Sequence, residues 1–260
     1  PVVSISANDV CTYDAASFSN NTTGATSYAW TFGDGNSSTM ASPSNKYSSA
    51  GTYKVLLSAT SSASCTSVDS IYVDAFAVPA ANFTVAAACL GDASDFKNTS
   101  SISAGTMSHA WDFGDFNGTS NNASPSYTYG GANTFTTQLI STSNNGCKDT
   151  ATASAVVNAL PSPDFSFSNV CAGNSMSFTN GSSGASSYSW TFGDGNSSSS
   201  TSPSNTYASD GKYTVTLEAT STAGCSDDVS KTVTVYALPT ASFTATNECL
   251  GDAMSTTNLS

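Results

Sequence analysis

Apolar and small polar residues alternate along most of the chain, and the clearest case runs from Tyr188 to Phe192. Tyr188, Trp190 and Phe192 fall on alternate positions, so an extended chain points all three rings to one face. This is the pattern of a half-buried β-strand. Residues 193–195 (Gly-Asp-Gly) follow directly, and glycine at positive φ beside an aspartate that bonds its own backbone is typical of a hairpin turn. We therefore predict a strand followed by a hairpin.

The same strand and hairpin recur at residues 28–35 and, with changes, at residues 109–116. Their tryptophans, Trp30, Trp111 and Trp190, are about 80 residues apart, which is the size of a small β-sandwich, and we expect each in a hydrophobic core. The 260 residues hold three such units and the opening of a fourth, which we place at residues 1–79, 80–161, 162–239 and 240–260. We therefore predict an all-β chain of sandwiches arranged end to end, with short proline-bearing links that restrict bending.

Each unit carries further strand patterns. In the first unit, Tyr53, Val55 and Leu57 share one face of a strand that begins at Gly51, and a last strand is expected at about residues 68–73. Residues 42–47 contain a proline, which removes a ladder donor and favours an edge strand. In the second unit, Phe116 replaces the second glycine of the hairpin, so we expect a longer or shifted turn there.

Charge and composition narrow the function. Only 9% of the residues are charged, and 18 acidic against 6 basic residues give a formal net charge of −12. Nucleic-acid binding needs clustered Lys and Arg, so we expect none, whereas divalent cations are compatible partners. The chain has no apolar run of about 18 residues and no signal-peptide pattern. We expect no membrane span in this segment and regard the segment as part of a longer, processed protein.

The sequence offers little for catalysis. His109 is the only histidine, and it occupies the inward position that Tyr28 and Tyr188 hold in the other units, so we assign it a packing role. No serine stands in a Gly-x-Ser-x-Gly elbow with a base in reach. We predict no enzyme activity.

A series of motifs carries a family resemblance. In the third unit they are the aromatic strand and hairpin at residues 190–195, Ser202-Pro203, Tyr207, and then Gly211, Tyr213, Val215 and Leu217. Together they resemble the PKD domain, an immunoglobulin-like sandwich. With one cysteine before the second strand and one before the last, the repeats look like those of large secreted Bacteroidota surface proteins, including gliding adhesins exported by the type 9 secretion route. That resemblance implies an extracellular location at the cell surface.

The seven cysteines form one pair per unit and one more near the end of the chain: Cys11 with Cys65, Cys89 with Cys147, Cys171 with Cys225, and Cys249. Paired occurrence in a chain of secreted character indicates disulfides. The simplest assignment is that each unit closes its own bond.

The topology of a seven-strand sandwich argues for a different pairing. The first cysteine of a unit falls in the turn after the first strand and the second in the turn before the last strand, at the opposite end. Strands of five to eight residues separate these turns by roughly 17 to 27 Å, while a disulfide needs Cα atoms within about 7 Å. If the units stack end to end, the expected bonds are Cys11 with Cys147 and Cys89 with Cys225. Cys65 then joins a preceding unit, and Cys171 and Cys249 join later ones. A misplaced strand restores the intradomain pairs, so both connectivities stay open.

Two further kinds of site are candidates. Asp34, Asp115 and Asp194 recur in the hairpin, where they either stabilise the turn or bind calcium, as some PKD domains resemble calcium modules. No other cofactor is expected. Residues 69–71 and 149–151 resemble the Bacteroidota O-glycosylation pattern, which implies sugar on Ser70 and Thr150.

Two functions remain open. The leading hypothesis is a non-catalytic stalk of a surface filament or adhesin, stiffened by disulfides, whose partners are neighbouring repeats and a surface polysaccharide or cell-envelope protein. The alternative is a set of accessory carbohydrate- or protein-binding modules of a secreted hydrolase. Many further copies in the full protein favour the first, and a catalytic domain beside a few copies favours the second.

Overall fold

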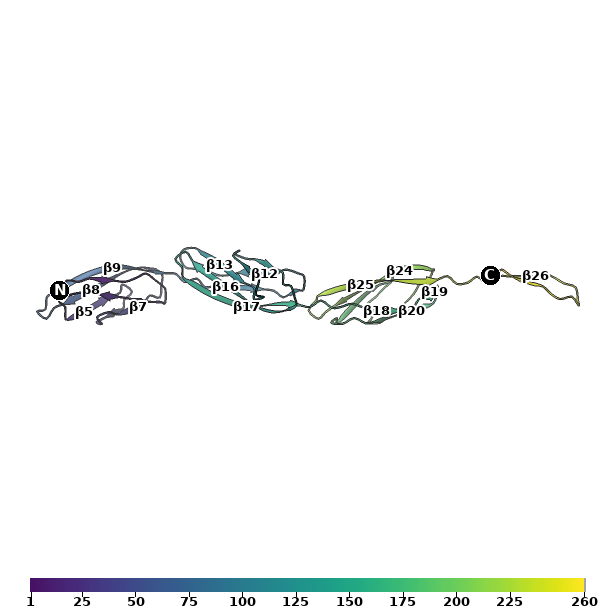
Figure 1. Cartoon of the computed structure of the whole chain (residues 1–260), viewed down its shortest axis with the longest axis horizontal. Helices are drawn as coiled ribbons and strands as arrows, with labels where there is room; N and C mark the ends of the chain where they lie inside the picture. Colours follow the sequence, from purple (N-terminus) through teal and green to yellow (C-terminus); the bar gives the residue numbers. More distant parts are fainter. Residues whose placement is uncertain (260) are drawn as a thin grey trace. The chain divides into compact units, whose positions relative to one another are not determined.

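The computed structural model describes residues 1–259, and all the regular structure within them is β-strand (Figure 1). The chain divides into two compact units, Pro1–Val157 and Asn158–Ser260. The first unit contains two sandwich domains with separate cores, and the second contains a third domain and a short hairpin. The predicted all-β class is therefore confirmed.

The first domain shows the architecture. Its strands are β1 (Ile5–Ser6), β2 (Val10–Cys11), β3 (Ala15–Ser17), β4 (Ser19–Asn20), β5 (Ser27–Thr31), β6 (Ser37–Ser38), β7 (Ser44–Lys46), β8 (Gly51–Thr60) and β9 (Thr66–Phe76). Five of them form one sheet in the order β2-β9-β8-β5-β6, and the pairs β1-β4 and β3-β7 form the other layer. All the pairings are antiparallel except that of β2 with β9, which is parallel.

The other two domains repeat this plan. The second consists of β10 (Phe83–Val85), β11 (Ala88–Cys89), β12 (Ser94–Asn98), β13 (Met107–Asp112), β14 (Thr119–Ser120), β15 (Ser126–Tyr127), β16 (Asn133–Ser143) and β17 (Lys148–Asn158). The third consists of β18 (Phe165–Phe167), β19 (Val170–Cys171), β20 (Ser175–Asn180), β21 (Ser187–Thr191), β22 (Ser197–Ser198), β23 (Ser204–Thr206), β24 (Gly211–Thr220) and β25 (Ser226–Tyr236). The five-stranded sheets have the orders β11-β17-β16-β13-β14 and β19-β25-β24-β21-β22, and the final hairpin pairs β26 (Phe243–Ala245) with β27 (Thr256–Asn258).

One tryptophan lies at the centre of each core. Trp30, Trp111 and Trp190 are 1%, 2% and 0% exposed, and each indole N–H donates to a backbone carbonyl at 2.9 to 3.0 Å. Because that donor is satisfied inside the sandwich, burial of the ring leaves no polar group unpaired. Val55 and Leu57 of β8 are fully buried beside Trp30, as the alternation along that strand predicts.

The hairpin after the tryptophan strand needs glycine for two reasons. Gly33 has a φ of 82°, and a Cβ built on it would lie 2.7 Å from the carbonyl oxygen of Lys54 on the neighbouring strand. In the first domain the turn closes through Phe32 N–H to the carbonyl of Asn36, whereas in the second Phe113 N–H reaches Gly118, one residue further on. The longer turn expected in the second domain is confirmed.

The proline-bearing segment forms an edge strand, as predicted. β7 pairs only with β3 in its layer, and the carbonyl of Pro43 accepts the Phe18 N–H at 3.0 Å. β9 is longer than the expected residues 68–73, because its pairing with β8 runs from Thr66 to Ala75. The length of β9 sets the distance between the two ends of the domain.

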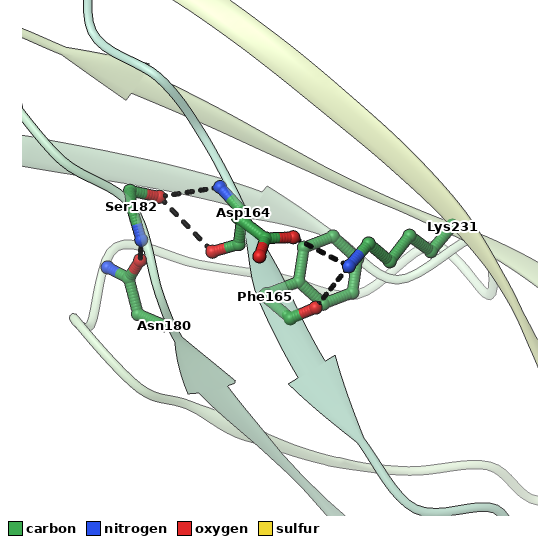
Figure 2. A network of polar contacts seen from close by, with 5 residues as sticks. All are labelled: Asp164, Phe165, Asn180, Ser182 and Lys231. Carbon is green, nitrogen blue, oxygen red and sulfur yellow. Dashed lines mark hydrogen bonds and ion pairs between the residues drawn. The ribbon is translucent and has the colours of Figure 1, made fainter.

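The third domain has an additional polar network that joins its first and last strands (Figure 2). Lys231 Nζ lies 2.7 Å from Asp164 Oδ1, donates to the Phe165 carbonyl at 2.5 Å and sits 5.0 Å from the centre of the Phe165 ring. The hydrogen bond from Lys231 holds the pKa of Asp164 below its ordinary value. Ser182 adds hydrogen bonds to the backbone N–H and carbonyl of Asp164. The network therefore ties one layer of the sandwich to the other.

Candidate functional site at a disulfide-bonded junction

Cys11 lies at the end of the first domain from which the chain leaves for the second. It belongs to the two-residue strand β2, whose parallel register sets Cys11 opposite Phe76, the last residue of β9. Thr12 N–H donates to the Phe76 carbonyl at 2.8 Å, and Asp14 N–H donates to the Cys11 carbonyl at 3.1 Å. These bonds fix the cysteine beside the interdomain link. The sequence predicted a turn here, since a two-residue strand has no periodicity to reveal it.

Cys147 lies in the turn between β16 and β17 of the second domain. Ser143 N–H donates to the Cys147 carbonyl at 2.8 Å, and Cys147 N–H donates to Ser143 Oγ at 3.0 Å. Gly146 closes the turn with a φ of 86°. The serine four residues before the cysteine recurs in the first and third domains as Ser61 and Ser221. That spacing was a signal for this turn that the sequence reasoning did not use.

A disulfide joins Cys11 to Cys147, with a Cα–Cα distance of 5.7 Å across 136 residues of sequence. Cys147 is 2% exposed, and Ala77 and Pro79 of the link are buried. Two crevices, of about 340 and 430 Å³, are each lined by residues of both domains. The first two domains are thus connected twice, once by the peptide chain and once by the disulfide.

The intradomain alternative is wrong for the first domain. Cys65 immediately precedes β9, whereas Cys11 lies beside its last residue. The 11 residues of β9 span about 33 Å at roughly 3.3 Å per residue, far beyond the reach of a disulfide. The distance exceeds the expected 17 to 27 Å because the last strand is longer than five to eight residues.

The remaining cysteines fall into two groups. Cys89 and Cys225 are disulfide-bonded, and Cys89 lies on the short strand β11. Within residues 1–259, Cys65, Cys171 and Cys249 are free thiols. Since Cys147 is bonded to Cys11 and Cys171 is free, the intradomain pairs of Cys89 with Cys147 and of Cys171 with Cys225 are also wrong.

The hairpin aspartates act as turn acceptors. Asp34 accepts hydrogen bonds from Asn36 N–H at 2.9 Å and Asn45 Nδ2 at 2.7 Å, and Asp194 repeats the arrangement with Asn196 and Asn205. Burial works to raise the pKa of Asp34, but the bonds from Asn45 and Asn36 outweigh it, and the pKa lies below its ordinary value.

Asp115 is held differently, by the Tyr127 hydroxyl at 2.5 Å and the Gly118 N–H at 2.8 Å. The hydrogen bond from Tyr127 lowers the pKa of Asp115, and the same bond raises the pKa of Tyr127 to about 12. All three hairpin carboxylates thus accept hydrogen bonds that stabilise the turn. Among residues 1–259 no group of three or more His, Cys, Asp or Glu is placed to hold a metal ion, and calcium at Asp34, Asp115 and Asp194 stays a prediction.

His109 packs at the rim of the second core. Its Nε2 lies 3.1 Å from Asn98 Nδ2, which is a donor, and its Nδ1 lies 3.2 Å from Ser141 Oγ. The ring therefore accepts at Nε2 and carries its proton on Nδ1, and burial lowers its pKa. The serine hydroxyl donates onward to Ser100 Oγ. These contacts are structural ones.

The two predicted glycosylation positions lie on last strands of their domains. Ser70 is half-buried on β9, and its N–H donates to Asp69 Oδ1 at 2.8 Å. Thr150 is exposed on β17, but the preceding Asp149 accepts the Ala81 N–H at 2.8 Å. Attachment of sugar at either position stays a prediction.

Comparison with known families identifies the fold. A family model described as the PKD domain matches residues 1–75, 77–159 and 158–236. The chain belongs to the PKD domain family. It therefore consists of tandem PKD domains, with a bonded junction between the first and second. A comparison with curated proteins finds no match.

Several solved structures are similar to parts of this PKD array. The PKD1 domain of Vibrio anguillarum Epp is 31% identical, covers 32% of this chain and 95% of its own, and has a TM-score of 0.30. The PKD1 domain of the Vibrio cholerae metalloprotease PrtV is 34% identical, with coverages of 29% and 96% and a TM-score of 0.27. A Ca2+-stabilized adhesin of an Antarctic bacterium is 13% identical, with coverages of 95% and 77% and a TM-score of 0.37. Across residues 1–259 no helix is long and apolar enough to cross a membrane.

Proposed function

We propose that this chain is a non-catalytic segment of an extracellular stalk, part of a cell-surface adhesin or filament that carries a distal region away from the cell. The observation that supports the proposal is the Cys11–Cys147 disulfide, which joins successive PKD domains instead of closing one. A binding module needs only its own fold, whereas a covalent bond across a junction restricts bending and separation of neighbours.

The position of the bond has a mechanical consequence. A chain pulled at its two ends transmits force from residue 11 directly to residue 147, because the disulfide bypasses everything between them. Most of the first two domains then carries no tension, even if their strands separate. A stalk built in this way resists lengthening under load without needing unusually stable domains.

Cys89 and Cys225 extend the proposal to the next junction. They stand at the same separation in the sequence as the 136 residues between Cys11 and Cys147, and both are disulfide-bonded. We propose that they bond to each other and repeat the arrangement. Peptide mapping without reductant should yield a Cys89–Cys225 peptide, and a peptide that joins either one to another cysteine contradicts the repeat.

Force spectroscopy on the whole chain, held at its two ends, tests the stalk directly. With reductant, each domain of about 80 residues should release roughly 270 Å when it unfolds, at about 3.4 Å per residue. Without reductant, the first two domains should release only a small fraction of that length. The variant with Cys11→Ser and Cys147→Ser is the matched control, and its first domain should lengthen fully without reductant. Full-length release of the first domain from the oxidised wild-type chain would contradict the stalk.

The hydrolase alternative makes different demands. Aromatic rings that bind polysaccharide must be exposed, whereas the three tryptophans are buried in the cores. The exposed rings of Tyr13, Tyr72 and Phe116 belong to three different segments and do not recur from domain to domain. The stalk also needs no calcium, and we expect thermal unfolding to be the same with a chelator and with added calcium.

We propose further that the surface is that of a cell using type 9 secretion, as in the gliding adhesins of Bacteroidota, and that residues 240–260 open a fourth domain. Immunogold labelling of intact cells tests the location, and intact mass tests sugar on Ser70 and Thr150.

A further inference from the structure

The end of the third domain repeats the half of the junction that carries Cys11. β19 pairs with β25 in the parallel register of β2 on β9, which sets Cys171 opposite Tyr236. Ala172 N–H donates to the Tyr236 carbonyl at 2.9 Å, and Asn174 N–H donates to the Cys171 carbonyl at 3.1 Å. The corresponding bonds at Cys11 are 2.8 and 3.1 Å. The backbone therefore positions the side chain of Cys171 in the same way as that of Cys11.

An apolar surface surrounds this thiol. At the first junction Ala77 is buried and Phe76 and Val78 are half-buried. The corresponding residues of the third domain are uncovered, and Tyr236 and Leu238 are 54% and 60% exposed. Exposed large apolar side chains that are covered at an equivalent position elsewhere in the same chain indicate a contact surface.

The first domain carries the complementary half of such a junction, the turn that holds the second cysteine. Cys65 occupies the same turn as Cys147, because Ser61 N–H donates to the Cys65 carbonyl at 2.9 Å and Cys65 N–H approaches Ser61 Oγ at 3.3 Å. Cys147 is buried in its junction, whereas Cys65 is exposed. The turn therefore forms in a PKD domain before any partner reaches it, so it can serve as a preformed docking element.

We propose that the end of the third domain formed by Cys171, Tyr236 and Leu238 docks the Ser-x-x-Gly-Cys turn of the following PKD domain and forms a disulfide with its cysteine. This inference rests on the stalk proposed above. The occupant is a PKD domain because the equivalent surface of the first domain holds such a turn. Residues 240–260 supply the first strand of that domain and tether it beside the surface, which raises the local concentration of its turn.

The bond forms by thiol–disulfide exchange with a low-molecular-weight disulfide. The Cys171 thiolate attacks one sulfur of that oxidant and releases one small thiol, leaving a mixed disulfide. The thiolate of the docked turn then attacks the Cys171 sulfur, forms the interdomain bond and releases the second small thiol. Two protein thiols are oxidised and one small disulfide is reduced, so the electrons balance.

The test completes the fourth domain with sequence from this chain. Residues 168–239 are appended after Ala245, which aligns Ser168 with the position of Thr246. The appended segment carries Cys171→Ser, which leaves a single Cys171, and Thr222→Ser, which changes the mass of its Cys225 peptide. After refolding in a glutathione redox buffer, peptide mapping without reductant should join Cys171 to this marked copy of Cys225. In the control, that copy is replaced by serine, and Cys171 should remain reactive toward a thiol reagent. Leu238→Asp should slow formation of the bond several-fold.

A second variant keeps the test decisive if the first appended domain folds poorly. It appends residues 86–161, whose turn carries the copy of Cys147 that is already seen in a bonded junction. Pairing of Cys171 with the appended turn in either variant supports the docking surface. A free Cys171 in both, or a bond to Cys65 of a second molecule, overturns it. Neither result alters the force measurement on Cys11 and Cys147, so failure here is distinguishable from failure of the stalk.

Discussion

Removing the Cys11–Cys147 disulfide should destabilise two domains and leave the third unchanged. The change is Cys11→Ser together with Cys147→Ser. When the first domain unfolds beside a folded second domain, the disulfide closes a loop from residue 11 to the link near residue 79. Ala80 and Cys147 lie at the same end of the second domain, because the Ala81 N–H donates to the side chain of Asp149, which is two residues after Cys147. The closed loop is therefore roughly 70 residues rather than the full 136.

The loop length sets the magnitude. A loop of roughly 70 residues corresponds to about 4 kcal/mol of lost chain entropy in the unfolded state, and native disulfides typically contribute about 2 to 4 kcal/mol. With a urea slope of about 1 kcal/mol per molar for a domain of this size, the midpoint should fall by about 2 to 4 M. Unfolding of the second domain closes a loop of similar length, so its midpoint should fall by a similar amount.

The three tryptophans make the assay specific for each domain. Trp30, Trp111 and Trp190 are buried in separate cores, so 19F NMR of the chain labelled with fluorotryptophan follows each domain by one resonance without removing a ring. The Trp30 and Trp111 transitions should move to lower urea, and the Trp190 transition should not. Cys65→Ser is the matched control, since this thiol is exposed and free in the part of the chain that the structure describes. Equal shifts at all three tryptophans, or none at Trp30, would refute the reasoning.

Three further predictions concern single side chains. Burial lowers the pKa of His109 in the folded domain. The second domain should therefore lose stability as the pH falls below about 6.5, the pKa of an unfolded histidine, and the loss should end at the lowered pKa. His109→Tyr should abolish this pH dependence in urea titrations at pH 5 and 8. Asn205→Leu removes the 2.7 Å hydrogen bond to Asp194, so the pKa of Asp194 should rise. The free energy of unfolding of the third domain should fall by about 1 to 3 kcal/mol near neutral pH. An NMR titration that finds the pKa of Asp194 unchanged contradicts the assignment. Phe116 has a φ of 70° and a fully exposed ring, so Phe116→Gly should raise the free energy of unfolding of the second domain, measured in urea, by up to about 1 kcal/mol. Phe116→Ala keeps the strained backbone and should not raise it.

Local pattern predicted the parts of this protein that depend on neighbours in the sequence. The rings of Tyr188, Trp190 and Phe192 share one face because alternation is a property of any extended chain, and the half-buried and buried positions follow it. The hairpin glycines, the proline-bearing edge strand and the longer turn at Phe116 were predictable for the same reason, since turn chemistry acts over a few residues.

Side-chain contacts between the layers were not predictable in this way. Lys231 lies on β25 and pairs with Val215 of β24, at the position that Ile71 holds in the first domain. Its place in the sequence gives no sign of a carboxylate partner. Its contact with Asp164 exists because the first and last strands of the sandwich meet through the fold. The same holds for Tyr127 and Asp115, which the fold brings to 2.5 Å.

The all-β class, the repeat, the core tryptophans and the two connectivities open to the cysteines all follow from local sequence. Only the folded arrangement distinguishes those connectivities at the first junction. Cys11 and Cys65 belong to one repeat but lie at opposite ends of an 11-residue strand, while Cys11 and Cys147 meet although 136 residues separate them. A disulfide depends on which ends of the domains face each other, and that arrangement follows from strand length and parallel pairing of β2 on β9 rather than from any pattern around the cysteines.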